Sequence, residues 1–383
     1  MSLPKTADIV IIGGGIMGVS LAYSLAERSQ IHIVLLERDL LAQASTGLCL
    51  GGIRQQFSLP SNIRLSQKSL GLFKRYQELF GVDIQLRQEG YLFLVQEEVT
   101  WAEFEKGISV QKSLGVPVEK LKREEIKYRW PYLTVDDFIG GTFCSEDGHV
   151  DPYLVTMALA KHARDRGVTI LEMTEATAIL REHGRITGVR TVKGTIRTPL
   201  VVNTAGPWAM EIGRMIGLNL PVKPFRRQVF MTKAFPALPQ PVPLVIEMDA
   251  SFYFRGEGEG LLIGMSDTDE PSSYHTHTDR SFLERVIGHA VKRAPVMEQA
   301  EILRGWGGLY AISPDENAII GHIPQHEGFL CAVGFSGHGF QHGPAVGEIL
   351  GDLILDGRTG FDLTPYSYER FEKGVTTQEK ATV

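Results

Sequence analysis

The order of apolar and polar residues near the start of the chain predicts a β-α-β unit over residues 7–37. The apolar run 7–12 is typical of a buried strand, and it leads directly into a glycine-rich turn. An apolar stretch of helical length follows. The run 31–36 then predicts a second, parallel strand that ends at the acidic residue Glu37.

Further along the chain, the pattern changes between helical and strand periods. Apolar residues three and four apart predict an amphipathic helix over 61–80 with a core-facing stripe. Short strands with a hairpin turn at Gly184 are predicted between residues 169 and 191. An apolar strand over 200–206 ends in a small-residue turn, and antiparallel strands are expected over 252–264. Other expected helices cover residues 153–166, 280–294 and 344–356.

The chain is too long for a single hydrophobic core, because 383 residues exceed the size at which chains divide into domains. We predict an α/β, Rossmann-like dinucleotide-binding domain that is interrupted twice by an antiparallel α+β substrate domain. The predicted dinucleotide-binding domain comprises residues 1–82, 144–218 and 317–374, the substrate domain comprises 83–143 and 219–316, and residues 375–383 form a flexible tail.

The glycine-rich turn has the spacing of a dinucleotide-binding motif. Gly13 permits a tight turn, Gly15 allows a pyrophosphate to approach the backbone, and Gly18 allows the helix to pack closely on the strand. The helix that begins near Ile16 and Met17 offers free N–H groups and a positive dipole end to phosphates. Glu37, followed by Arg38, stands where a carboxylate accepts hydrogen bonds from a ribose. The motif predicts a bound dinucleotide without identifying which one.

Composition and charge narrow the class of partner. A net charge of −6 disfavours nucleic acids and anionic membranes as partners, and no apolar run is long enough to span a membrane. Three scattered cysteines give neither a disulfide framework nor a metal-ligand spacing, so a cytoplasmic location is expected. The histidines at 275, 277, 338 and 342 have no companion ligands in a metal-binding pattern, so no metal is expected.

Two later segments have the composition of ligand-binding turns. The strand over 200–206 ends in Ala205 and Gly206 just before Trp208, where backbone N–H groups would return to the nucleotide. Residues 334–340 interleave three glycines with aromatic residues and His338 before a helix. Such a loop can donate N–H groups to the carbonyls of a planar ring and stabilise negative charge there.

With these motifs, the sequence resembles the amine-oxidising flavoproteins, a family that includes D-amino-acid oxidase, glycine oxidase and sarcosine oxidase. The segments 13–18, 203–206, 305–310 and 334–340 occur in matching order, and the resemblance covers nearly the whole chain. It is strongest to the branch of sarcosine oxidase and amino-acid dehydrogenase β-subunits. The resemblance implies non-covalent FAD and oxidation of a C–N bond in a small amine or amino acid, such as sarcosine, dimethylglycine, glycine or a proline-like compound. Hydride transfer to flavin N5 would give an imine that water hydrolyses.

The resemblance also implies roles for single residues. Arg54 matches an arginine that approaches the substrate carboxylate, for which a guanidinium is chemically suited. Tyr253, His338 and Gln341 complete the expected catalytic set. The further residues expected to bind the cofactor are Ser45, Thr46, Gly52, Thr177, Ala205, Gly206, Trp208, Gly308, Gly337, Gly339 and Phe340, together with His338 and Gln341.

The chain departs from the monomeric sarcosine oxidases at three positions. Gly308 replaces the cysteine that links the flavin, and Gln341 replaces a substrate-binding lysine. Leu262 stands near the place of an oxygen-activating lysine. Without that cation, oxygen and another electron acceptor are both open alternatives.

Two other functions are also compatible with the sequence. The chain could be an FAD-binding, β-type subunit of a hetero-oligomeric dehydrogenase with limited activity alone, and both homo- and hetero-oligomers fit its composition. It could also be an NAD-dependent dehydrogenase that uses the same N-terminal unit, although the segments 203–206 and 334–340 disfavour this alternative.

Overall fold

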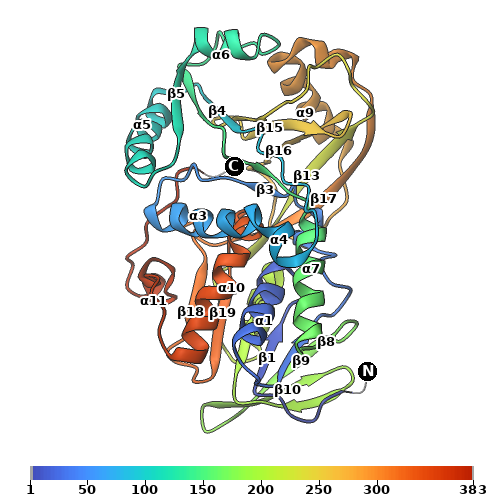
Figure 1. Cartoon of the computed structure of the whole chain (residues 1–383), viewed down its shortest axis with the longest axis vertical. Helices are drawn as coiled ribbons and strands as arrows, with labels where there is room; N and C mark the ends of the chain where they lie inside the picture. Colours follow the sequence, from blue (N-terminus) through green and yellow to red (C-terminus); the bar gives the residue numbers. More distant parts are fainter. Residues whose placement is uncertain (1–2, 382–383) are drawn as a thin grey trace.

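The computed structural model describes residues 3–381 and has two lobes (Figure 1). A six-stranded sheet forms one lobe, with the strand order β18-β19-β12-β1-β2-β8. All neighbouring pairs in it are parallel except β18 and β19. Its strands are β1 (Ile9–Ile12), β2 (Ile33–Leu36), β8 (Thr169–Leu171), β12 (Val201–Asn203), β18 (Ile319–His322) and β19 (Phe329–Val333).

Both faces of this sheet are buried, which explains its continuous apolar strands. Along β1, Ile9 and Ile11 join the core beneath the helices, whereas Val10 and Ile12 join a second core on the opposite face. The helices on the first face are α1 (Ile16–Arg28), α7 (Pro152–Asp165) and α10 (Gly339–Asp356). The second face is covered by α8 (Ala209–Arg214) and by a small sheet of β9 (Ala176–Glu182), β10 (Arg185–Thr191) and β11 (Gly194–Arg197).

An eight-stranded sheet forms the other lobe, in the order β17-β13-β16-β15-β14-β4-β6-β5. Its pairs are antiparallel except β14 with β4. The strands are β4 (Tyr91–Val95), β5 (Val118–Lys122), β6 (Gly140–Cys144), β13 (Lys223–Thr232), β14 (Leu244–Glu247), β15 (Phe252–Glu257), β16 (Gly260–Met265) and β17 (Ile302–Ile312). The helices of this lobe are α5 (Glu98–Ser113), α6 (Arg123–Arg129) and α9 (Arg280–Arg293).

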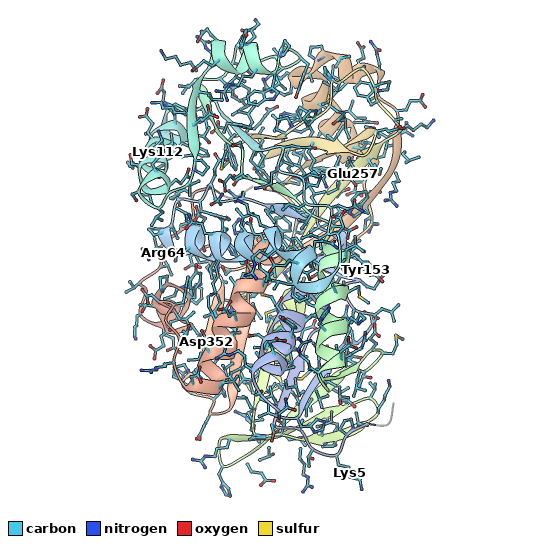
Figure 2. The ribbon with its side chains drawn as sticks, viewed as in Figure 1. Lys5, Arg64, Lys112, Tyr153, Glu257 and Asp352 are labelled. Atoms are coloured by element: carbon cyan, nitrogen blue, oxygen red, sulfur yellow. The ribbon has the colours of Figure 1, made fainter. Side chains whose placement is uncertain are left out.

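Between the lobes lie α3 (Pro60–Lys74) and α4 (Tyr76–Phe80), as Figures 1 and 2 show. The remaining elements that position the site are short. They are α2 (Ser45–Leu48), the strand pair β3 (Gly52–Ile53) and β7 (Gly148–His149), the 3₁₀ helices η1 (Gly206–Trp208), η2 (Pro295–Gln299) and η3 (Thr364–Tyr366), and α11 (Glu369–Glu372).

The predicted α/β fold class and the N-terminal β-α-β unit are confirmed. The hairpin turn at Gly184 is also present, with a positive φ of 83°. The helix expected over 61–80 is divided at Arg75 into α3 and α4. The final helix begins at Gly339, five residues before the predicted 344. The predicted division of the chain into domains stays a prediction.

The segment expected to be a flexible tail is exposed at residues 375–378 but contacts the rest of the protein at residues 379–381. Glu379 and Ala381 are buried, at 0% and 6% exposure, whereas Lys380 between them faces outward. The Glu379 carboxylate accepts hydrogen bonds from Ser58, Leu59 and Asn62 near the start of α3. This segment is polar in sequence, so composition alone does not reveal that one acidic side chain docks it. Residues 382 and 383 lie outside the described part of the chain.

The three cysteines are free thiols, and in residues 3–381 no helix is long and apolar enough to cross a membrane. The cytoplasmic location stays a prediction.

Packing of α10 on α1 generates the first testable prediction. A Cβ added to Gly347 would lie 2.5 Å from the backbone carbon of Ser20, so Gly347→Ala forces the two helices apart. We expect it to lower the free energy of unfolding by about 1–3 kcal/mol, as overpacking does. The matched control is Gly71→Ala in α3, where an added Cβ meets nothing within 4 Å. Alanine there should be neutral or stabilise by about 0.5–1 kcal/mol. Chemical denaturation measures both, and equal effects would contradict the packing account.

Candidate cofactor and substrate site

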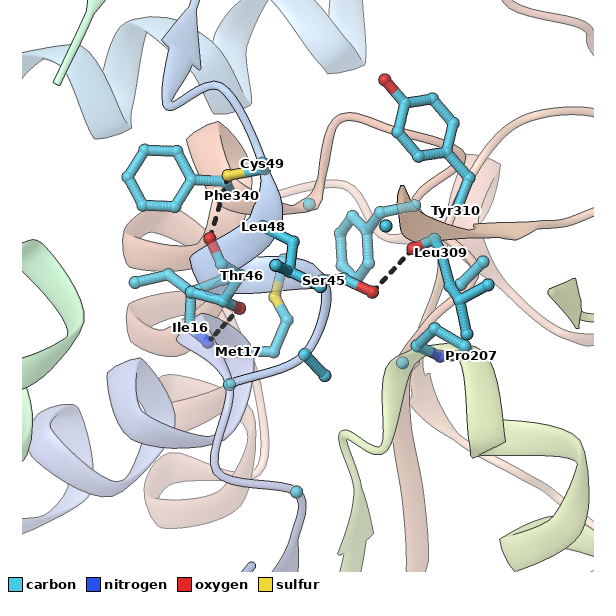
Figure 3. Close-up of a pocket in the computed structure, with 18 of the residues that line it drawn as sticks. Ile16, Met17, Ser45, Thr46, Leu48, Cys49, Pro207, Leu309, Tyr310 and Phe340 are labelled. Carbon is cyan, nitrogen blue, oxygen red and sulfur yellow. Dashed lines mark hydrogen bonds between the residues drawn. The ribbon is translucent and has the colours of Figure 1, made fainter. Parts of the chain in front are cut away.

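One cavity of about 850 Å³ runs between the two lobes. It starts at the carboxyl ends of β1, β2 and β12, close to where the order of the parallel strands reverses, and ends against one face of the eight-stranded sheet. Open α/β sheets bind ligands at this kind of edge. Figure 3 shows α2 and the start of α1 on one side of the cavity, with β17 and Pro207 on the other.

Close backbone contacts in the glycine-rich turn exclude a side chain at two of its positions. Gly13 has a φ of 118°, and a Cβ there would lie 2.5 Å from the carbonyl oxygen of Thr204. A Cβ on Gly18 would lie 2.0 Å from the carbonyl oxygen of Gly13. Gly15 precedes the first turn of α1, and Ile16 N–H donates to the Thr46 hydroxyl at 3.1 Å (Figure 3). The start of α1 therefore faces the cavity with backbone donors, as phosphate binding requires.

The segment after β2 lies beside this turn. The Glu37 carboxylate accepts hydrogen bonds from Gly14 N–H at 2.7 Å and from Asp39 N–H at 2.8 Å. Glu37 and Arg38 both line the cavity, as the motif predicted. Ser45, in α2, donates its hydroxyl hydrogen to the Leu309 carbonyl at 2.6 Å and so joins the two lobes (Figure 3).

Three side chains form a stack beside the Glu37 end of the cavity. The Arg38 guanidinium lies 3.8 Å from the centre of the Trp208 ring, and Tyr274 stacks on that ring at 5.7 Å with an interplanar angle of 10°. All three line the cavity, and Tyr274 comes from the loop between β16 and α9. The sequence motifs contain Arg38 and Trp208, but nothing near Tyr274 indicated this contact.

Ion pairs connect the loop that carries Tyr274 to the eight-stranded sheet. Arg226, on β13, pairs with Glu270 at 2.8 Å and with Asp279 at 2.5 Å, and it donates to the His277 carbonyl. Burial, and then a hydrogen bond to Glu211, raise the pKa of Tyr274 to about 12. The phenol is therefore neutral at physiological pH and donates its hydrogen to Glu211.

The opposite end of the cavity is lined by β17 and by the loop before α10. Gly337 has a φ of 95°, and a Cβ there would lie 2.5 Å from the Tyr310 ring. Gly339 opens α10, and Phe340 stacks on Phe73 at 5.9 Å. Gly308, on β17, lines the cavity without a side chain. This closely packed backbone fits the edge of a planar ring.

One face of the eight-stranded sheet closes this end. Because side chains alternate along a strand, every second residue of β13, β14 and β15 faces the cavity. The sheet residues in the lining are Tyr91, Arg227, Val229, Leu244, Ile246, Tyr253, Arg255, Gly308, Leu309, Tyr310 and Ala311. Burial raises the pKa values of Tyr91, Tyr253 and Tyr310, so these phenols are neutral.

Arg54 lies at the junction of the cavity, α3 and the tail segment. Its guanidinium donates to the carbonyls of Gln56 and Ala381 and lies 3.2 Å from His338 Nε2. The Arg54 backbone N–H donates to Gln341 Oε1 at 2.6 Å. Burial is the main cause that lowers the pKa of Arg54, whose reference value is so high that the group stays charged.

His338 and Gln341, expected in the catalytic set, are both buried in the cavity wall. Burial, reinforced by the Arg54 charge, lowers the pKa of His338 well below its usual value. A neutral His338 accepts the Arg54 hydrogen bond at Nε2. His338 thus contacts the Arg54 guanidinium, and Gln341 accepts a hydrogen bond from the Arg54 backbone N–H. The spacing of these residues in the sequence did not indicate either contact.

Arg227 is a site residue that sequence reasoning missed. It lines the cavity and lies 5.2 Å from the centre of the Tyr310 ring. Its Nη1 donates only to the neighbouring Arg226 carbonyl, and its buried Nε has no hydrogen-bond partner among the described residues. A buried cationic donor without a partner indicates a missing anionic ligand. Strand alternation could have identified this residue if the bounds of β13 had been known.

Two predicted cofactor residues, Thr177 and Gly18, lie outside the cavity lining. Thr177 is exposed on β9, and its hydroxyl donates to the Arg190 carbonyl. The lining instead ends at Met173, Thr174, Glu175 and Ala176, one residue earlier. Gly18 is also outside the lining, because its place is in the contact between α1 and β1.

The other predicted residues line the cavity, namely Gly13, Gly15, Ile16, Met17, Glu37, Arg38, Ser45, Thr46, Gly52, Arg54, Ala205, Gly206, Trp208, Tyr253, Gly308, Gly337, His338, Gly339, Phe340 and Gln341. Within residues 3–381, no group of three or more His, Cys, Asp or Glu side chains is arranged to hold a metal ion.

Comparison with known proteins identifies the family. The model of the FAD dependent oxidoreductase family DAO matches residues 8–353. The chain belongs to this family. It is therefore an FAD-dependent oxidoreductase, and the NAD-dependent alternative is set aside.

The relatives of this FAD-dependent oxidoreductase share its fold over nearly its whole length. The crystal structure of L-proline dehydrogenase from P. horikoshii is 35% identical with a TM-score of 0.90, and the match covers 98% of this chain and 100% of that one. Glycine oxidase from Geobacillus kaustophilus is 25% identical with a TM-score of 0.84, covering 95% and 98%. Mitochondrial dimethylglycine dehydrogenase of Rattus norvegicus is 32% identical over 97% of this chain. The chain spans only 46% of that relative's length.

The residues present fit FAD. A Cβ on Gly13 would overlap Thr204 and one on Gly337 would overlap the Tyr310 ring, so both turns need glycine, and both glycines line the cavity. The turn after β1 and the start of α1 would hold the diphosphate, Glu37 the ribose, and the loop before α10 the isoalloxazine ring. Gly308 offers no side chain for covalent attachment at that position.

The aromatic stack at the Glu37 end predicts slow FAD release. We expect Tyr274→Ala to accelerate FAD dissociation about three- to tenfold, because an aromatic stack contributes about 0.5–1.5 kcal/mol. The recovery of flavin fluorescence after dilution of the holoenzyme measures the rate. Tyr274→Phe, which keeps the ring but loses the phenol, should release FAD at nearly the wild-type rate. If Tyr274→Phe is as fast as Tyr274→Ala, the phenol contact with Glu211 and not the stack retains the cofactor.

Proposed function

We propose that this FAD-dependent oxidoreductase oxidises the C–N bond of a small amine that carries a carboxylate, such as an N-methylated or cyclic amino acid. The observation that carries the proposal is the pair of arginines at the sheet end of the cavity, Arg54 and Arg227. Bound FAD supplies the acceptor for the hydride that leaves the substrate carbon. The protein binds the amine and orients it.

The charges at this end favour an anionic substrate group. Arg54, Arg227 and Arg255 all line the cavity, but only Arg255 has a carboxylate partner, Glu257 at 2.5 Å. Among the described residues, neither Arg54 nor Arg227 forms a salt bridge. A substrate carboxylate would supply the missing countercharge, since guanidinium groups bind carboxylates through two parallel hydrogen bonds.

The rest of this end is suited to an uncharged amine. The lining acids Glu37, Asp39, Glu175 and Glu211 belong to the Glu37 end of the cavity, and none belongs to the sheet. The neighbouring phenols and His338 are neutral. We infer that the substrate binds with its amine deprotonated and that placement, rather than a protein base, supplies most of the acceleration.

The size and polarity of the wall support a compact substrate. Val229, Leu244 and Ile246 offer an aliphatic surface to a methyl group or a ring. The relatives named above act on proline, glycine and dimethylglycine according to their names, and all three compounds combine an amine with a carboxylate. Which of them this chain accepts depends on this wall.

We further propose that the electrons pass to an acceptor other than oxygen. Leu262 lies directly opposite Arg255 in the register of β15 and β16, so Arg255 is a cation beside the position of the missing lysine. Glu257 compensates the Arg255 charge at 2.5 Å, which reduces its help to a developing superoxide. A partner subunit is one source of such an acceptor, which is the second candidate role.

The first prediction of this proposal concerns reduction without oxygen. The purified holoenzyme should be yellow, and mixing it anaerobically with sarcosine, dimethylglycine or proline should bleach the flavin band with at least one of them. Propionate, which has the carboxylate but no amine, is the control and should shift the spectrum without bleaching. A protein that takes up FAD but is bleached by none of a panel of amines would overturn the proposal.

The second prediction concerns the carboxylate. Arg227→Met should raise KM about ten- to a hundredfold, since a hydrogen bond to a charged group contributes about 1.5–3 kcal/mol. The value of kcat should change less. Arg304→Met, on the exposed part of β17, is the matched control and should leave KM unchanged. Equal KM values for the wild type and Arg227→Met would exclude this role for Arg227.

A further inference from the structure

The segment 377–381 is bound to the protein through one fully buried carboxylate. Glu379 has 0% of its surface exposed, and its carboxylate accepts five hydrogen bonds. Four come from residues just before α3 and in its first turn, namely Ser58 N–H at 2.7 Å, the Ser58 hydroxyl at 2.6 Å, Leu59 N–H at 3.2 Å and Asn62 Nδ2 at 2.9 Å. The fifth comes from Ala381 N–H at 3.0 Å.

These hydrogen bonds give donors to the buried Glu379 carboxylate and acceptors to N–H groups at the start of α3. The donors from Ser58 and Leu59 precede α3, whose first N–H groups have no partner within the helix. A negative charge is favoured at this end of the helix dipole. Lys380 N–H also donates to the Ser58 hydroxyl oxygen at 3.0 Å, so the segment is held along its backbone as well.

The hydrogen bond from Ala381 N–H to Glu379 turns the backbone so that the Ala381 carbonyl meets Arg54. The Arg54 Nη2 donates to this carbonyl, and Nη1 donates to the Gln56 carbonyl. Ala381 does not line the cavity, whereas Arg54 and its neighbour His338 do. The segment therefore contacts the guanidinium from outside the cavity and leaves the substrate side open.

We propose that Glu379 is a positioning residue that fixes the Arg54 guanidinium at the edge of the substrate cavity. This inference rests on the proposed carboxylate-binding role of Arg54. The guanidinium lies on the Phe57 ring at 4.1 Å and has no salt bridge among the described residues. Two carbonyl groups and His338 Nε2 set its direction, and one of the carbonyls is placed by Glu379 through Ala381. Releasing the segment frees one guanidinium donor and allows the side chain to take other rotamers.

The test measures ligand binding to the FAD-loaded enzyme through the change in its visible flavin spectrum. The probes are pyrrole-2-carboxylate and its uncharged analogue pyrrole-2-carboxamide. We expect Glu379→Gln to weaken binding of the carboxylate about five- to tenfold, to leave binding of the carboxamide unchanged, and to raise KM with kcat within twofold of wild type. The matched control is Lys380→Ala, because that side chain faces outward and its Nζ donates to Gln378, away from Arg54. It should behave as wild type.

A double-mutant cycle separates this inference from the proposed function. Arg54→Lys alone should weaken carboxylate binding, and adding Glu379→Gln to it should have less than a twofold further effect, because the two residues act through one contact. If Arg54→Lys binds the carboxylate as wild type does, the role proposed for Arg54 fails. If Arg54→Lys weakens binding but Glu379→Gln does not, or if the effects multiply in the double variant, only the positioning role fails.

A milder variant keeps the test valid if Glu379→Gln does not fold. Ser58→Ala removes one hydroxyl from the Glu379 site and leaves both backbone donors in place. It should weaken carboxylate binding about two- to threefold and spare carboxamide binding. Equal weakening of both probes would indicate a general loss of structure and overturn the inference.

Discussion

Close backbone contact between α1 and its neighbours is the constraint on which the rest of the structure depends. Gly18 lets α1 approach the turn after β1, and Gly347 lets α10 approach α1, since a Cβ at either position would overlap backbone atoms. Both helices begin at the same cavity, α1 beside the glycine-rich turn and α10 beside Gly337. Their mutual packing therefore sets the distance between the two ends of the cavity, at which the diphosphate and the ring of FAD would be held.

Charge organises the other half of the site. The cavity wall at the sheet holds three arginines, and each is restrained by carbonyl groups that keep its direction without neutralising it. Only Arg255 also has an acid beside it. In surroundings of low dielectric constant, cations held in this way attract an anion strongly. The proposed preference for a carboxylate therefore rests on the lack of acidic partners for Arg54 and Arg227 among the described residues as well as on the two arginines themselves.

Much of the cofactor end could be predicted from the sequence, because its requirements are local. Gly13, Gly15 and Glu37 are within one β-α-β unit, and their spacing already encodes their positions around a nucleotide. The sheet end could not be predicted in the same way. Arg227 faces the cavity only because of the register of β13 with β17, and a shift of one residue would turn its side chain to the other face. The sequence likewise did not show that the lining ends at Ala176, one residue before Thr177.

The tail segment shows a different limit of sequence reasoning. A polar, charged stretch at the end of a domain has the composition of a frayed terminus, and most such stretches bury too little apolar surface to be ordered. Here a single carboxylate is sufficient, because the start of α3 presents several unpaired donors at one point. The packing of α3 between the lobes brings those donors together. One of them, Leu59 N–H, is 320 residues away from Glu379 in the sequence. Order in this segment is thus a property of the receiving surface, and only the folded structure reveals that surface.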